Sequence, residues 1–190
     1  LVVYPNYYGV TFDLLSVTAL AHARDVTVLV DEAHGPHLRF SEALPPDALS
    51  CGADLVAQST HKLLGSLTQT SMLFRQGGRV SGEAVRRAAA LLTTTSPNYL
   101  LLASLDIARL QMATYGSDLI GRAVRLAAGV RRVVNDSPGL WCFGEEYMGR
   151  PGAEALDVTK VTVQTAWLGL SGAAAADILR RQYNLQCELA

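Results

Sequence analysis

Short apolar runs alternate with longer amphipathic stretches in the first two thirds of the chain, a pattern typical of α/β proteins. The apolar runs predict strands at residues 1–4, 26–30, 53–59 and 71–74. Residues 26–30 are β-branched and apolar with little alternation, which predicts a strand covered on both faces, as in a parallel sheet. The predicted fold class is therefore α/β with a mainly parallel sheet.

The amphipathic stretches predict helices that follow recognisable capping residues. The capping candidates are Asp13 or Thr11, Asp47 and Ser81. The helices they precede are expected at residues 14–21, 47–51 and 82–92, with Gly52 ending the second. Pro97 fits the first turn of a further helix, whose pattern continues toward residue 115 and resumes from 118 to 134.

The pattern changes at residues 135–139, where Asn, Asp, Ser, Pro and Gly follow one another. The later part predicts a strand at 140–143, a polar loop at 144–155, an open-faced strand region at 158–166, a helix from Ser171 to residue 181, and a strand from residue 185. We therefore expect a large domain over residues 1–135 and the beginning of a smaller α+β domain over 136–190. Because both ends read as strand interiors and no initiator Met is present, we expect a fragment of a longer protein.

Two polar side chains follow predicted strands where such sheets bind ligands. Asp31 ends the strand at 26–30, and Lys62 comes just after the strand at 53–59. In open α/β sheets, ligands bind at the carboxyl ends of the strands. A lysine in such a crevice can lose its proton and act as a nucleophile. The ordinary alternative is a carboxylate at a strand end and a solvated lysine in a loop.

Composition and charge exclude several classes of protein. Hydrophobic residues make up 49% of the 190 and charged residues 17%, which indicates a core-rich globular chain. The formal net charge of −1 provides no basic field for nucleic acid. The apolar runs are too short to span a bilayer, and no signal pattern is present. Cys51, Cys142 and Cys187 form no C-x-x-C pair, which favours reduced thiols and a cytoplasmic location.

The segment from Asp31 to His34 allows two other interpretations. Asp-Glu-Ala-His is the box of one helicase class, but that box works beside a G-x-x-x-x-G-K-[ST] loop, and the chain contains no Gly-Lys pair. Asp31, His34, His37 and His61 have side chains that suit zinc. Their spacing is neither a helical i, i+4 pair nor a Cys-rich knuckle, so we predict no metal site.

The motif Ser59-Thr60-His61-Lys62 resembles the S-x-H-K lysine motif of the bacterial ornithine/lysine/arginine decarboxylases. Further segments resemble this family in the same order, at residues 5–9, 30–35, 58–64, 69–72, 95–97 and 103–106. The resemblance covers essentially the whole chain. It implies the large domain of a pyridoxal 5′-phosphate (PLP) enzyme with the aspartate aminotransferase fold (fold type I), whose long helices bridge the two domains. It further implies decarboxylation of arginine, lysine or ornithine in polyamine biosynthesis.

The resemblance also implies a role for each residue of the site. Lys62 would form the Schiff base with PLP, and Asp31 would face the pyridinium nitrogen. Ala33 would pack against the ring, His34 would touch its phenolic oxygen, and Ser59 and His61 would contact the phosphate. Thr95 and Ser96 would reach the phosphate in a partner subunit, which implies a homodimer or a larger even-numbered assembly; ordinary N-capping is their alternative role. Tyr7 or Tyr8 would border the site, or simply cap the sheet.

Other functions stay open at this level. The Asp-Glu-Ala-His box also resembles the α-oxoamine synthases, although their lysine usually follows Ser rather than His. An aminotransferase or such a synthase is therefore one alternative, and a non-catalytic binding or regulatory subunit is the other. The phosphate cup and the ring-stacking residue of the family lie upstream of this sequence. The acidic partner that would select the substrate side chain is not assigned.

Overall fold

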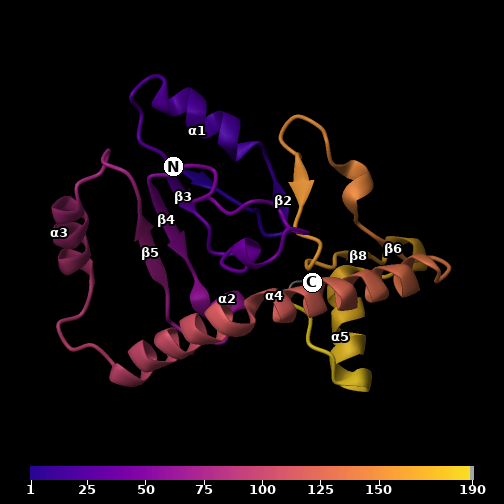
Figure 1. Cartoon of the computed structure of the whole chain (residues 1–190). Coiled ribbons are helices and arrows are strands. Elements are labelled where there is room, and N and C mark those ends of the chain that lie inside the picture. Colours follow the sequence, from indigo (N-terminus) through magenta and orange to yellow (C-terminus); the bar gives the residue numbers. More distant parts are fainter. Residues whose placement is uncertain (189–190) are drawn as a thin grey trace.

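The computed structural model describes residues 1–188. Its centre is a four-stranded sheet in the order β1 (Val2–Val3), β3 (Leu29–Asp31), β4 (Leu55–Gln58) and β5 (Met72–Arg75), as Figure 1 shows. β1, β3 and β4 run parallel, and β5 is antiparallel to β4 at the edge. The predicted α/β class with a mainly parallel sheet is confirmed, and the four strands lie within or next to the predicted segments.

Helix α1 (Leu14–His22) covers one face of this sheet. Its N-cap is Asp13, whose Oδ1 accepts a hydrogen bond from Ser16 N at 2.9 Å. Leu14 is 1% exposed and belongs to the same core cluster as Val30 and Val56 of the sheet. Val30 and Val56 are partners in the register of β3 and β4, so their side chains point to the same face of the sheet. This is the face that α1 covers.

The opposite face of the sheet is open in the described part of the chain. Val3 and Leu73 are 57% and 55% exposed, and Leu29 of β3 is also exposed. The prediction that the strand at residues 26–30, which is β3 in the structure, is covered on both faces is therefore wrong for this chain. Side chains of opposite faces alternate, and the described elements cover only the face of Val28 and Val30.

Two helices follow β5. α3 (Gly82–Leu92) begins after Ser81, whose Oγ accepts a hydrogen bond from Ala84 N as predicted. α4 (Tyr99–Asn135) is one continuous helix and shows no interruption near residue 115. It runs beneath the sheet toward the C-terminal part of the chain (Figure 1). Asn98 caps it, so the expectation that Pro97 lies in its first turn is wrong.

The side of α4 that faces the rest of the protein carries small and flexible residues. Its buried positions are Ala108, Met112, Gly116, Ile120 and Ala127. Their spacing of four and seven residues places them on one stripe of the helix. At Gly116 the Phe40 ring comes so close that a built Cβ would lie 2.6 Å from Phe40 Cδ1. Phe40 belongs to the short helix η1 (Leu38–Phe40), so glycine permits this contact.

Two glycines of α4 are expected to respond to alanine with opposite signs. Gly116→Ala should lower the free energy of unfolding by about 1–3 kcal/mol, because the new methyl group overpacks the Phe40 contact. Gly129 meets no described atom within 4 Å at its built Cβ. Gly129→Ala should therefore raise stability by about 0.5–1 kcal/mol through helix propensity. Urea denaturation of the two variants checks the pair, and equal effects would contradict the packing argument.

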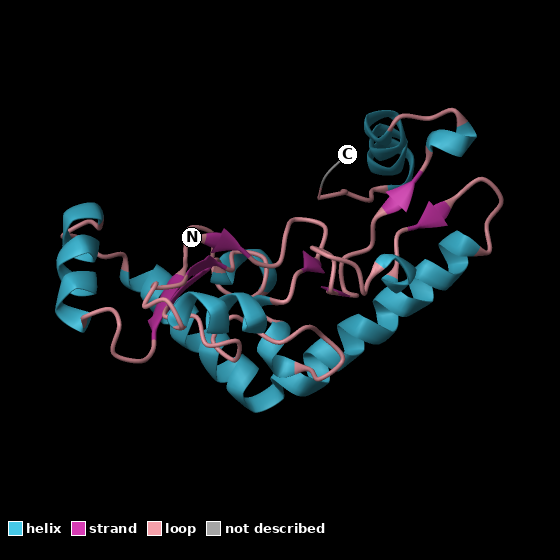
Figure 2. Cartoon of the chain, turned by 90° about the horizontal axis from the view of Figure 1, so that it is seen from above, coloured by secondary structure: helices cyan, strands magenta, loops and turns pink. Residues whose placement is uncertain are grey.

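Up to residue 188, the C-terminal part contains two small sheets, two 3-10 helices and one α-helix. β2 (Val10–Thr11) pairs antiparallel with β7 (Ala155–Leu156), and β6 (Trp141–Cys142) pairs with β8 (Val163–Gln164). The 3-10 helices η2 (Glu145–Tyr147) and η3 (Ala166–Leu168) precede α5 (Gly172–Tyr183), which begins after Ser171 as predicted. Figure 2 shows this part at the end of α4 away from the four-stranded sheet. The β2–β7 pair connects it to the beginning of the chain.

Several boundaries in this part differ from the predictions. The loop expected at 144–155 ends in β7, and the strand expected at 158–166 is mostly irregular apart from β8. Residues 185–188 are not a strand, and residues 189–190 lie outside the described range.

The helix expected after Asp47 is only a turn, which Asp47 caps by accepting hydrogen bonds from Leu49 N and Ser50 N. Two-residue strands are hard to find by alternation, because their pairing partner defines them.

No helix within residues 1–188 combines the length and the hydropathy needed to cross a membrane.

Candidate functional site

The parallel strands bring Asp31 and Lys62 to the same edge of the sheet. Asp31 is the last residue of β3 and lies opposite Ala57 of β4. β4 ends one residue later, and the short helix α2 (Thr60–Leu63) carries Lys62. Lys62 N donates a hydrogen bond to Ser59 O at 3.1 Å, and no side-chain cap comes from Ser59. The sheet register therefore accounts for the neighbourhood of the predicted pair.

Lys62 and His34 are in direct contact. The distance between Lys62 Nζ and His34 Nε2 is 3.3 Å. Burial lowers the pKa of His34, and the positive charges of Lys62 and Lys160 lower it further. A neutral imidazole then accepts the hydrogen bond that Nζ donates. The rings of Tyr7 and His34 pack edge to face, with 4.7 Å between their centroids.

The carboxylate of Asp31 is partly fixed by its own loop. Oδ1 accepts a hydrogen bond from Ala33 N at 3.0 Å, and the residue is exposed. Within residues 1–188 the other oxygen, Oδ2, accepts no hydrogen bond, so it remains available to a donor on a ligand. Ala33 is half-buried beside it, as a residue that borders a flat ring would be.

His61 is oriented by the chain that follows it. Its Nδ1 donates a hydrogen bond to Thr70 O at 2.6 Å, which leaves Nε2 as the other ring nitrogen. Ser59 and His61 are both half-buried at the start of α2, the edge of the sheet where Asp31 also lies. The structure therefore brings Asp31, Ala33, His34, Ser59, His61 and Lys62 into one region.

Thr95 and Ser96 are not part of this region. Both are exposed in the connection between α3 and α4, where Ser96 N donates to Thr94 Oγ1 at 3.1 Å. No polar contact among the described residues joins them to Asp31, His34 or Lys62. Ordinary capping does not explain them either, because Asn98 caps α4. Their predicted contact with a partner subunit stays a prediction.

Glu32 is a buried acid that the sequence did not single out. It is 0% exposed, Oε1 accepts from Ala48 N at 2.7 Å, and Oε2 accepts from Gln58 Nε2 at 2.5 Å. Burial raises the pKa of Glu32 to about 7, although both hydrogen bonds oppose the rise. Strand alternation could have indicated this burial, because neighbouring residues of a strand point to opposite faces and Asp31 lies on the exposed face.

The free energy of unfolding is therefore expected to depend on Glu32 between about pH 4.5 and 7. In this range the unfolded chain has released the proton and the folded protein retains it, so stability falls as pH rises, by about 3 kcal/mol in all. Glu32→Gln, which mimics the neutral acid, should remove this fall. Thermal unfolding of the wild type and the variant across this range measures the difference. The exposed Glu42→Gln is the control, and an unchanged slope in Glu32→Gln would contradict the assignment.

His37 belongs to a second buried polar group. The distance between His37 Nε2 and Asp157 Oδ2 is 2.9 Å, and the two residues are 3% and 0% exposed. Thr159 Oγ1 donates to Asp157 Oδ1 at 2.6 Å. Within residues 1–188, no group of three or more His, Cys, Asp or Glu side chains is arranged to hold a metal ion. His37 thus connects the loop after β3 to the segment after β7, a contact that sequence spacing did not reveal.

The fold and this arrangement define a class of protein. The solved structures that resemble the chain are PLP-dependent enzymes of fold type I, so the predicted fold is confirmed. They include the constitutive lysine decarboxylase of E. coli, with a TM-score of 0.64 and 27% identity over 85% of this chain and 27% of that one. A methionine γ-lyase from Micromonospora echinospora has a TM-score of 0.61 at 20% identity, over 100% of this chain and 50% of that one, and shows the fold alone.

The family is shown by sequence. The family model for the major domain of Orn/Lys/Arg decarboxylases matches residues 1–180. A protein named arginine decarboxylase in Halalkalibacterium halodurans is 47% identical over 189 residues, which are 100% of this chain and 38% of that protein. The chain belongs to the Orn/Lys/Arg decarboxylase family, and the predicted family is confirmed. The chain spans less than half the length of the relatives it matches.

The side chains present here fit PLP. An aldehyde needs an amine, and Lys62 offers Nζ at the edge of the sheet. A protonated ring nitrogen needs an acceptor, and Asp31 Oδ2 is available on the same edge. Ser59 and His61 provide a hydroxyl and a ring nitrogen near the start of α2, which suits a phosphate.

Proposed function

We propose that the protein to which this chain belongs decarboxylates a basic amino acid with PLP as cofactor. The observation that carries the proposal is the arrangement of Asp31 and Lys62 at adjacent parallel strand ends, with His34 in contact with Lys62. Membership of the decarboxylase family supports the type of reaction. PLP, when bound, supplies an electron sink for the bond that breaks at the α-carbon.

The residues of the chain would divide the work as follows. Lys62 Nζ holds the cofactor covalently, and Asp31 keeps the ring nitrogen protonated because a nearby negative charge raises its pKa. His34, held by Tyr7, borders Nζ and positions it. Ala33 packs against the ring, and Ser59 and His61 contact the phosphate.

We infer that arginine is the first substrate to test. The relatives with 46–47% identity across the whole chain are named arginine decarboxylase, whereas E. coli lysine decarboxylase matches 60% of the chain at 32%. A panel of arginine, lysine and ornithine, with CO2 release as the measurement, ranks the three. Amino transfer without CO2 release would favour an aminotransferase instead.

Reduction with borohydride tests the proposal directly. The full-length protein is incubated with PLP, reduced, digested and mapped by mass spectrometry. The sequence contains two lysines, Lys62 and Lys160, so the peptides distinguish them. A pyridoxyl group on Lys62 is the expected result. A folded protein that carries the group elsewhere, or nowhere, would overturn the proposal and leave a binding or regulatory role.

Four further predictions accompany this function. We propose a homodimer or larger even-numbered assembly in which Thr95 and Ser96 contact the phosphate of the partner subunit, with a domain boundary at residues 135–136. We also propose a cytoplasmic location and a role in polyamine biosynthesis. Sedimentation of the full-length protein measures the assembly, and a fully active monomer would refute it.

A further inference from the structure

Lys160 is the second lysine of the chain and lies against the candidate site. Its stem covers Gly9, where a built Cβ would lie 2.8 Å from Lys160 Cγ. Gly9 ends the turn that carries Tyr7, and Tyr7 contacts His34. The charge of Lys160 also lowers the pKa of His34, second only to Lys62 among the charges. His34 is therefore in contact with Lys62 and is influenced by the charge of Lys160.

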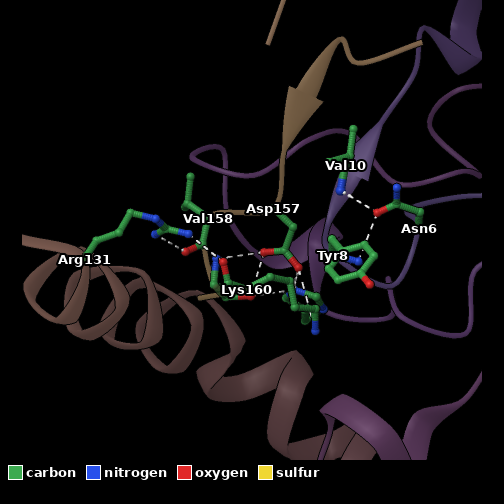
Figure 3. A network of polar contacts seen from close by, with 9 residues as sticks. Asn6, Tyr8, Val10, Arg131, Asp157, Val158 and Lys160 are labelled. Atoms are coloured by element: carbon green, nitrogen blue, oxygen red, sulfur yellow. Dashed lines mark hydrogen bonds and ion pairs between the residues drawn. The ribbon is translucent and has the colours of Figure 1, made fainter. Parts of the chain in front are cut away.

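The segment that carries Lys160 is held from three sides. Arg131 of α4 donates hydrogen bonds to Val158 O at 2.8 Å and to Lys160 O at 2.5 Å, as Figure 3 shows. On the second side, Asp157 N donates to Gly9 O at 2.8 Å, and on the third, the Asp157 carboxylate binds His37. These contacts fix the backbone of the segment, and so the direction in which the Lys160 side chain leaves it.

The ammonium group of Lys160 donates no hydrogen bond in the part of the chain that the structure describes, and its ion pair with Asp157 is long. Its side chain is 17% exposed. In that pair, Asp157 Oδ2 is 4.0 Å from Nζ, which is longer than a hydrogen bond. That oxygen already accepts the bond from His37, and Asp157 Oδ1 accepts from Thr159. Glu188 also acts on Lys160 by charge, but its Oε1 accepts from Tyr7 Oη at 3.0 Å.

A largely desolvated cation with free donors is costly unless an anion meets it. Burial lowers the pKa of Lys160, while the charges of Asp157 and Glu188 oppose this. We propose that Lys160 is an anion-binding residue of the site, which receives an oxyanion of the bound ligand. Under the proposed function, on which this inference rests, that oxyanion is either the carboxylate of the amino acid or the phosphate of the cofactor.

Matched ligand pairs distinguish the two sources. PLP and pyridoxal differ by the phosphate, and arginine and agmatine differ by the carboxylate. Equilibrium dialysis compares full-length protein with the variants Lys160→Met and Lys160→Arg. The arginine pair is measured in a Lys62→Ala background, which removes turnover. Arg109→Met, which removes an exposed cation of α4, is the control.

Lys160→Met should weaken the binding of either PLP or arginine by about tenfold or more, because one charge-assisted hydrogen bond is lost. The affinity for the matching ligand that lacks the oxyanion, pyridoxal or agmatine, should stay unchanged. Lys160→Arg should retain most of the affinity, and Arg109→Met all of it. Equal affinities of the wild type and Lys160→Met for all four ligands would overturn the inference. So would equal losses within both pairs, which would indicate a structural role for Lys160.

A second measurement needs no variant. Limited acetylation of the wild-type protein, followed by peptide mapping, reports how accessible Lys160 is. Its acetylation should slow when PLP or arginine is present, and an unchanged rate with both would count against the inference. The borohydride adduct on Lys62 is independent of Lys160. Its absence would overturn the proposed function, whereas an adduct with unchanged Lys160 behaviour would overturn only the role of Lys160.

Discussion

Asp31→Asn is expected to reduce kcat of the full-length enzyme by about a thousandfold, or ~4 kcal/mol in activation free energy, while PLP content changes little. The amide has the shape of the carboxylate and can still accept the hydrogen bond from Ala33 N. It lacks the negative charge that keeps the ring nitrogen protonated. The measurements are CO2 release at saturating substrate and the PLP bound per protomer.

The control for this prediction is Asp25→Asn. Asp25 is an exposed aspartate with a positive φ of 57°, a backbone conformation that asparagine also adopts, and it pairs with Arg79. Its activity should equal that of the wild type. If Asp31→Asn loses PLP and turnover in equal proportion, Asp31 holds the cofactor rather than tuning it. If neither changes, Asp31 has no role in the reaction.

Asp157→Ala is expected to lower the free energy of unfolding by about 3 kcal/mol, because it leaves the buried His37 side chain without its hydrogen-bond partner. Asp157 is 0% exposed, and its bonds to His37 and Thr159 join the loop after β3 to the segment after β7. Urea denaturation with comparable m-values measures the change. Asp177→Ala breaks exposed pairs with Arg180 and Arg181 of α5, which are screened by solvent, and should cost far less.

The pH dependence gives this prediction a second check. Burial alone would raise the pKa of Asp157, but the hydrogen bond and charge of His37 hold it below its ordinary value of 3.8. A lowered pKa in the folded state contributes stability above the unfolded value, and this contribution is lost as pH falls. The difference between wild type and Asp157→Ala should therefore shrink below about pH 4. Equal costs for Asp157→Ala and Asp177→Ala would contradict the role of burial.

The candidate site was predictable because its residues are close in sequence to strand ends. Asp31 and Lys62 each follow an apolar run, and parallel strands place their carboxyl ends at one edge. The family resemblance was confirmed by the match over residues 1–180. The S-x-H-K motif could be recognised because its four residues are consecutive; in the structure Ser59 is the N-cap of α2 and the other three lie in it.

Contacts between distant segments were not predictable in the same way. His37 and Asp157 are 120 residues apart, and Tyr7 and Glu188 are 181 apart. Lys160 lay within the strand region expected at residues 158–166 and was not singled out, and its position against Gly9 depends on the β2–β7 pair and on Arg131. The covered and open faces of the sheet were also missed, since burial depends on which elements pack there.

The sequence by itself determined the α/β class, the family, the helix cap Ser81, the choice of Asp13 or Thr11 as a second cap, the start of a helix near Ser171, and the residues at the strand ends. These follow from local periodicity, hydrogen bonding to neighbouring backbone, and short motifs. Only the tertiary structure decided the contact of Lys62 with His34, the burial of Glu32, the His37–Asp157 pair and the position of Lys160 against Gly9. The physical reason is that burial and charge interactions depend on distances in space, which chain packing sets between residues that are far apart in sequence.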